Sequence, residues 1–124
     1  MTKPASILIV DDEPDMCWAL RNTLRKEGYC ITTVTTAREA LARVQGGGLA
    51  AVIIDAMLPD MDGRDLAAQI RQTDSTPVLI LLSGYFYPED KVVVEGLQQG
   101  LYSAFISKPF SIKDVRSAVR KAIG

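Results

Sequence analysis

Five polar side chains stand where apolar runs of the sequence end, and their chemical types suit phosphoryl transfer. Asp11 and Asp12 follow the run SILIV, Asp55 follows AVII, Ser83 follows VLILL, and Lys108 comes two positions after YSAFI. Three carboxylates, a hydroxyl and an ammonium group include a nucleophile and the groups that neutralise the oxygens of a transferred phosphoryl group. The alternative for Asp55, taken alone, is a purely structural role in a turn, because Asp, Pro and Gly are common turn residues.

The apolar runs have the pattern of buried strands. We expect strands at residues 6–10, 29–34, 51–54, 77–82 and 102–106, three of which are continuously apolar, as in strands covered on both faces. Apolar residues at helical spacing predict helices between these runs and after the last one, including a weaker prediction for residues 90–99. Because strands and helices alternate, the sequence predicts an α/β domain with a parallel sheet between helices.

Right-handed crossovers place the carboxyl ends of parallel strands at one edge of the sheet, where such sheets bind ligands. Two carboxylates about 5 Å apart repel by about 3 kcal/mol at an effective dielectric of about 20, so a cation between them is favoured. Lys108 offsets only one of the three acids. Mg²⁺ suits the remaining charge, because it prefers oxygen ligands and keeps waters for phosphate oxygens.

This chemistry assigns a role to each of the five residues. Asp55 is the candidate nucleophile, which would form an acyl phosphate. Asp11 and Asp12 are candidate metal ligands, Lys108 would pair with the phosphoryl oxygens, and Ser83 would donate a hydrogen bond to them.

Composition excludes several other classes of function. The chain has 124 residues, a net charge of −1 and no histidine, which excludes Ser-His and Cys-His catalysis and histidine-bound zinc. The small net charge gives no indication of nucleic-acid or membrane binding, and no apolar run is long enough to span a membrane. We expect one cytoplasmic domain over residues 1–124, with Cys17 and Cys30 as reduced packing residues.

Four motifs resemble the receiver domain of bacterial two-component response regulators over essentially the whole chain. They are ILIVDDEP (7–14), VIIDAMLPDMDG (52–63), LLSG (81–84) and SKPF (107–110). The resemblance implies a flavodoxin-like, doubly wound sheet of five strands in the order 2-1-3-4-5. It also implies a signalling switch rather than a metabolic enzyme, phosphorylated at Asp55 by a histidine kinase or histidine phosphotransfer protein.

The resemblance implies a metal-ligand set as well. Mg²⁺ would be held by Asp12, Asp55 and the main-chain carbonyl of Met57, and through water by Asp11. Lys108-Pro109 resembles the cis peptide that aims the family's lysine inward.

Ser83 and Phe105 match the hydroxyl and aromatic residues of the family's switch. Phosphorylation would draw Ser83 toward the new oxygens and let Phe105 turn inward, changing the surface of the fourth helix, fifth strand and fifth helix. An ordinary core role for Phe105 remains the alternative, and the 25 positions from Ser83 to Lys108 exceed the family's usual spacing. Met57 and Tyr85 occupy positions that tune dephosphorylation in relatives, and their bulk predicts a long phosphoryl lifetime.

Further residues are predicted to lie outside the catalytic cluster. Trp18 falls off the apolar stripe of its helix, so we expect it at the surface, either docking the phosphodonor or partly covered by its neighbours. Asp60, Asp62 and Gly63 are interpreted as turn and helix-start residues rather than metal ligands.

Two other classes of function remain as alternatives. A phosphatase of the haloacid-dehalogenase type would use the same residue types, but its acids form a D-x-D motif, whereas here they are adjacent in VDDE. A degenerate interaction module is the other alternative. The expected downstream partner is an effector domain or protein, and a phosphorylation-dependent homodimer is left open.

Overall fold

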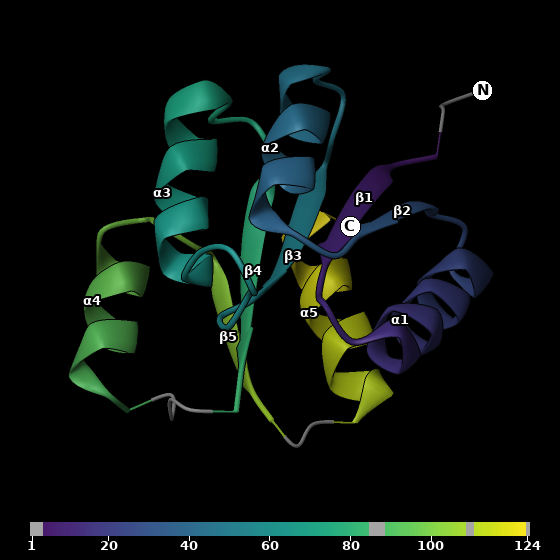
Figure 1. The fold of residues 1–124 in the computed structure, drawn as a ribbon. Coiled ribbons are helices and arrows are strands. Elements are labelled where there is room, and N and C mark those ends of the chain that lie inside the picture. The colour runs from purple at the N-terminus through teal and green to yellow at the C-terminus, as the bar shows by residue number, and fades with distance from the viewer. Residues whose placement is uncertain (1–3, 85–88, 109–110, 124) are drawn as a thin grey trace.

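The structure, a computed structural model, describes residues 4–84, 89–108 and 111–123. Within these ranges, five strands alternate with five helices (Figure 1). The strands are β1 (Ser6–Val10), β2 (Cys30–Val34), β3 (Ala51–Asp55), β4 (Val78–Ser83) and β5 (Ala104–Ser107). The helices are α1 (Pro14–Lys26), α2 (Ala37–Gln45), α3 (Gly63–Thr73), α4 (Lys91–Gln98) and α5 (Ile112–Ile123).

All five strands are parallel, and their order in the sheet is β2-β1-β3-β4-β5. This confirms the predicted fold class and strand order. Helices α1 and α5 cover one face of the sheet, and α2, α3 and α4 cover the other (Figure 1). The helix expected near residues 90–99 is present as α4. The fifth strand begins two residues later than predicted, at Ala104.

The sheet divides the apolar core into two clusters because successive strand residues point to opposite faces. Leu8, Val52 and Ile54 belong to the cluster under α2, α3 and α4. Ile7 and Ile53 belong to the cluster under α1 and α5. Strands β1 and β3 are almost entirely buried, which explains why their sequences are continuously apolar and not alternating.

Gly63 lets α3 begin directly against the end of β3. A Cβ atom at this position would lie 2.8 Å from the Ala56 Cα and 3.0 Å from the Asp55 carbonyl carbon, which is too close for any side chain. The Gly63 main-chain N–H donates to the Ala56 carbonyl over 2.8 Å. The loop after Asp55 is therefore closed tightly onto the strand end.

Helix α4 is held to the sheet by few buried residues. Among the described residues of this helix only Val93 and Gly96 are buried. The side chain of Tyr102, from the segment before β5, packs beneath α4 and is completely buried. Its hydroxyl donates a hydrogen bond of 3.2 Å to the Val93 carbonyl.

Helices α1 and α5 are joined by ion pairs at one end. The Glu27 carboxylate lies 3.2 Å from the Arg116 guanidinium and 2.9 Å from that of Arg120. All three side chains are at least partly exposed, so we assign these pairs a small stabilisation and a mainly orienting role.

The two cysteines differ in burial, which corrects one sequence prediction. Cys17 is buried in α1 as expected, but Cys30 is exposed at the start of β2, and both thiols are free. Cys30 is exposed because β2 is an edge strand whose residues are at best half-buried. Trp18 is 70% exposed, which confirms its predicted place at the surface. No helix within the described ranges is both long and apolar enough to cross a membrane.

Candidate metal and phosphoryl-transfer site

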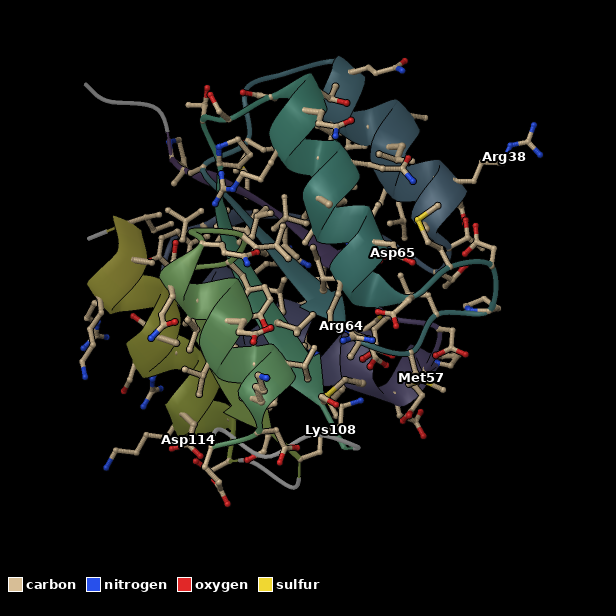
Figure 2. All side chains as sticks on the ribbon, turned by 90° about the vertical axis from the view of Figure 1, so that its left-hand side faces the viewer. Arg38, Met57, Arg64, Asp65, Lys108 and Asp114 are labelled. Carbon is tan, nitrogen blue, oxygen red and sulfur yellow. The ribbon has the colours of Figure 1, made fainter. Side chains whose placement is uncertain are left out.

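The sheet brings the predicted polar residues to a single edge. Asp11 and Asp12 directly follow β1, Asp55 is the last residue of β3, Ser83 ends β4, and Lys108 follows β5. Parallel register keeps these strand ends level, since Val10 pairs with Ile54 in the neighbouring strand. Figure 2 shows Met57 and Lys108 at this end of the molecule.

The three aspartates form a compact cluster of carboxylates. One oxygen from each of Asp11, Asp12 and Asp55 lies within 4.8 Å of the others. Asp11 and Asp55 are buried, whereas Asp12 is exposed. Two buried carboxylates in this proximity repel each other unless a proton or a cation is present.

Asp11 shows that negative charge is incompletely balanced in the cluster. Its Oδ1 atom accepts a 2.9 Å hydrogen bond from the Glu13 main-chain N–H, but Oδ2 is buried and has no hydrogen-bond partner among the described residues. Burial, with a further contribution from the Asp55 charge, raises the pKa of Asp11 to about 6. A buried carboxylate oxygen that accepts no hydrogen bond, beside two other carboxylates, is part of a donor set that suits a hard divalent cation such as Mg²⁺.

Lys108 supplies the positive charge of the cluster. Its Nζ atom lies 3.3 Å from Asp55 Oδ2 and 3.9 Å from Asp11 Oδ2. Burial disfavours the ammonium form, but the charges of Asp55 and Asp11 outweigh this effect and raise the pKa of Lys108. The Lys108 main-chain N–H also donates to the Ser83 carbonyl over 2.7 Å, which fixes the segment after β5 against the end of β4.

Met57 lies beside the cluster on the loop that follows β3. Its main-chain N–H donates to Asp55 Oδ1 over 3.2 Å, so the backbone of this loop orients the carboxylate. Its side chain is 52% exposed. A cavity of about 430 Å³ opens at this point, lined by Asp12, Glu13, Asp55, Met57, Gly84 and Lys108. Glu13 was not predicted as a site residue, although its position directly after Asp12 is the signal that could have identified it.

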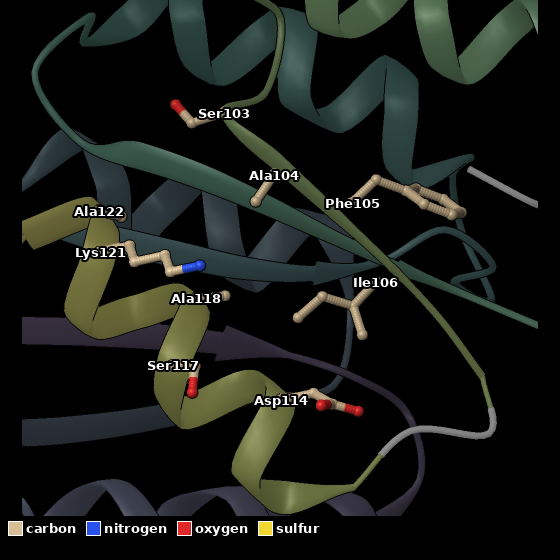
Figure 3. A pocket seen from close by; sticks show the side chains of 9 residues that line it. All are labelled: Ser103, Ala104, Phe105, Ile106, Asp114, Ser117, Ala118, Lys121 and Ala122. Carbon is tan, nitrogen blue, oxygen red and sulfur yellow. The ribbon is translucent and has the colours of Figure 1, made fainter. Parts of the chain in front are cut away.

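The two residues of the predicted switch lie on neighbouring strands. Ser83 is completely buried and is in register with Ser107 of β5. Phe105 is in register with Leu81 and packs against the core cluster under α2, α3 and α4. Figure 3 shows its ring on the side of β5 opposite Ile106, which faces α5. The switching role of Phe105 stays a prediction, as does the alternative that it is an ordinary core residue.

Asp60, Asp62 and Gly63 lie outside the carboxylate cluster, as predicted. Asp62 is the N-cap of α3, because its side chain accepts the Arg64 main-chain N–H over 2.8 Å. Asp60 instead reaches α2, where it accepts from the main-chain N–H groups of Ala37 and Arg38, a contact the sequence did not reveal. The predictions that concern Tyr85 and Pro109 lie outside the described residues.

Comparison with known proteins identifies relatives of this arrangement. Residues 7–120 match the family model described as response regulator receiver domain. Sensory transduction protein RegX3 of Mycobacterium tuberculosis is 37% identical over 118 residues, which cover 95% of this chain and 50% of that protein. Transcriptional regulatory protein TcrA of the same species is 36% identical over 115 residues, 92% of this chain and 44% of that protein. The chain thus spans about half the length of these relatives.

Solved structures match the whole fold. A receiver domain from Methanospirillum hungatei, described as CheY-like, has a TM-score of 0.88 at 25% identity and covers 97% of this chain and 94% of its own. Response regulator protein TrrA from Thermotoga maritima, solved in complex with Mg²⁺ and BeF, has a TM-score of 0.82 at 29% identity. That match covers 95% of this chain and 98% of that one.

Proposed function

This chain belongs to the response regulator receiver domain family, and from that premise we propose that residues 1–124 form a phosphorylation-dependent switch whose acceptor is Asp55. The observation that carries this proposal is the placement of Lys108 against Asp55 beside the carboxylate cluster. The donor would be a phosphohistidine of a histidine kinase or phosphotransfer protein in the cytoplasm. The comparisons give no support to the phosphatase alternative.

The reaction would transfer one phosphoryl group to the Asp55 side chain. A carboxylate oxygen of Asp55 attacks phosphorus, a new O–P bond forms, and the P–N bond to the donor imidazole breaks with its electron pair returning to nitrogen. Lys108 would then pair with the phosphoryl oxygens, and the Ser83 hydroxyl would donate a hydrogen bond to them. These groups are fixed before the reaction by the strand ends, so little reorganisation is needed.

Asp11, Asp12, Asp55 and the Met57 main-chain carbonyl would hold Mg²⁺. The bound ion would neutralise charge that develops on the phosphoryl oxygens. The Asp11 oxygen that accepts no hydrogen bond supports this ligand set, and the solved complex of TrrA with Mg²⁺ supports the choice of ion.

The output surface would be formed by α4, β5 and α5. Phe105 pairs with Leu81, two residues before Ser83 in β4, so a change at the end of β4 would reach β5. A groove of about 540 Å³ lies between β5 and α5, lined by Ala104, Ile106 and Ala118 among others (Figure 3). An effector domain or protein, or a second phosphorylated copy, would bind this surface.

The phosphodonor would dock beside the site, on α1. Trp18 is highly exposed, and a cavity of about 290 Å³ beside it is lined by Pro14, Cys17, Arg21 and Thr33 among others. An exposed aromatic residue with an apolar hollow is typical of a protein interface.

Acetyl phosphate with Mg²⁺ tests the proposal. We expect the protein to gain the mass of one phosphoryl group, and we expect Asp55→Ala to abolish the gain. Asp65→Ala, which removes an exposed carboxylate from α3, is the matched control and should react like the wild type. Phosphorylation that persists in Asp55→Ala would refute the assignment, and continuous release of phosphate over many turnovers would favour the phosphatase.

A further inference from the structure

The loop between β3 and α3 is attached to a helix from an earlier part of the chain. The Asp60 carboxylate accepts two main-chain hydrogen bonds, from Ala37 at 2.9 Å and from Arg38 at 3.0 Å. These two hydrogen bonds lower the pKa of Asp60, so the carboxylate is charged at neutral pH. Figure 2 shows the Arg38 side chain pointing into solvent, so only its backbone takes part.

Asp60 completes the capping of α2, because the helix's own N-cap residue accepts a hydrogen bond from a single main-chain N–H group. The first N–H groups of any helix have no partner within the helix. The Thr36 side chain accepts the Glu39 main-chain N–H over 3.1 Å, as an N-cap residue does. Asp60 supplies acceptors for the two preceding N–H groups, and its negative charge also suits the positive end of the helix dipole.

Hydrogen bonds at the two ends of this loop attach it to the phosphoryl-transfer site. Met57 and Asp62 form an isolated antiparallel bridge across the loop. Gly63 N–H donates to the Ala56 carbonyl at 2.8 Å, and Met57 N–H donates to Asp55 at 3.2 Å. Asp60 lies between these fixed points, three residues after Met57 and two before Asp62.

We propose that Asp60 is a positioning residue for the metal site: by fastening the loop to α2, it fixes the Met57 backbone against Asp55. The inference rests on the proposed function, since it assigns Mg²⁺ to this cluster. A ligand that is held in place before the ion arrives loses less conformational freedom on binding. Loss of this attachment should therefore weaken Mg²⁺ binding, although Asp60 is not among the proposed ligands.

Asp60→Ala and Thr36→Ala separate this role from simple helix capping. Both substitutions remove hydrogen bonds from the first turn of α2, but only Asp60→Ala also detaches the loop from that helix. Mg²⁺ affinity of each variant is measured by titration calorimetry, and the unfolding midpoint is measured in EDTA. We expect the Kd for Mg²⁺ to rise about tenfold in Asp60→Ala and to stay within about twofold of wild type in Thr36→Ala.

A second readout uses the rate of phosphorylation by acetyl phosphate. In Asp60→Ala the rate should approach the wild-type rate at saturating Mg²⁺, because the acceptor and Lys108 remain in place. Asp60→Asn, which keeps one acceptor oxygen, should show a smaller loss of Mg²⁺ affinity. It replaces Asp60→Ala in the test if the alanine variant does not fold. Equal affinities in the wild type and both Asp60 variants, or equal losses in Asp60→Ala and Thr36→Ala, would overturn the inference. A wild-type protein that binds no Mg²⁺ would instead refute the proposed metal site.

Discussion

The ring of Tyr102 fills the space that a side chain on Gly96 would occupy. A Cβ atom at position 96 would lie 2.5 Å from the Tyr102 Cζ and 2.8 Å from its Cε1. Because real Cβ atoms do not approach so closely, only glycine allows α4 to rest on this buried ring. A glycine inside a helix is otherwise unfavourable by about 1 kcal/mol relative to alanine.

We therefore predict that Gly96→Ala destabilises the protein in spite of its higher helix propensity. Overpacking against Tyr102 should outweigh the propensity gain and lower the free energy of unfolding by about 1–2 kcal/mol. Urea denaturation measures this loss. In the background of Tyr102→Leu, the same substitution should be neutral or stabilising; an equal loss in both backgrounds would show that the ring is not the cause.

Asp11 makes stability in EDTA depend on pH. Its pKa is raised to about 6 in the folded protein from 3.8, so the folded state binds more protons than the unfolded state between these values. Stability due to this group is therefore lost as the pH rises through about 6. We expect Asp11→Asn to gain about 1 kcal/mol relative to wild type between pH 5 and pH 7.5. A constant difference between the two proteins would contradict the shifted pKa.

Met57 should prolong the life of the phosphorylated state. Met57 lines the cavity beside Asp55, and we expect its bulk to restrict the approach of the water that would attack phosphorus. We predict that Met57→Asn, alone or with Tyr85→Ala, shortens the phosphoryl half-life by about threefold or more. The measurement is the decay of phosphorylated protein after the donor is removed. An unchanged half-life in the double variant would show that these side chains do not control access.

Trp18 should affect transfer from a protein donor but not from a small one. Loss of a central aromatic residue from an interface commonly lowers affinity about tenfold or more. We expect Trp18→Ala to slow transfer from a phosphohistidine protein and to leave the rate with acetyl phosphate unchanged. Arg38→Ala, at an exposed position on α2, is the control. A loss with both donors would place the effect in the site itself.

The fold and most of the candidate site follow from local features of the sequence. Continuous apolar runs mark β1, β3 and β4, because these strands are covered on both faces. The sequence predicted the proximity of Asp11, Asp55 and Lys108, because every parallel strand in such a sheet ends at the same edge.

The residues that were missed depend on partners far along the chain. Asp60 stands in a Pro-Asp sequence that a local turn explains fully, and nothing nearby reveals its contact with α2, 23 residues away. Tyr102 was included in the fifth strand, but it precedes β5 and packs under α4. Cys30 was expected inside because the pattern of β2 alone does not show that the strand lies at the edge of the sheet.

The ion pairs between Glu27 and α5 have a consequence for any protein that covers both α4 and α5. Because Arg116 and Arg120 orient α5 against α1, we expect phosphorylation to leave the part of the α5 surface near these pairs unchanged. Contacts of equal strength in two states shift no equilibrium, however tight they are. Discrimination between the resting and phosphorylated forms would then come from contacts with α4 and β5, while this part of α5 would contribute affinity that is the same in both.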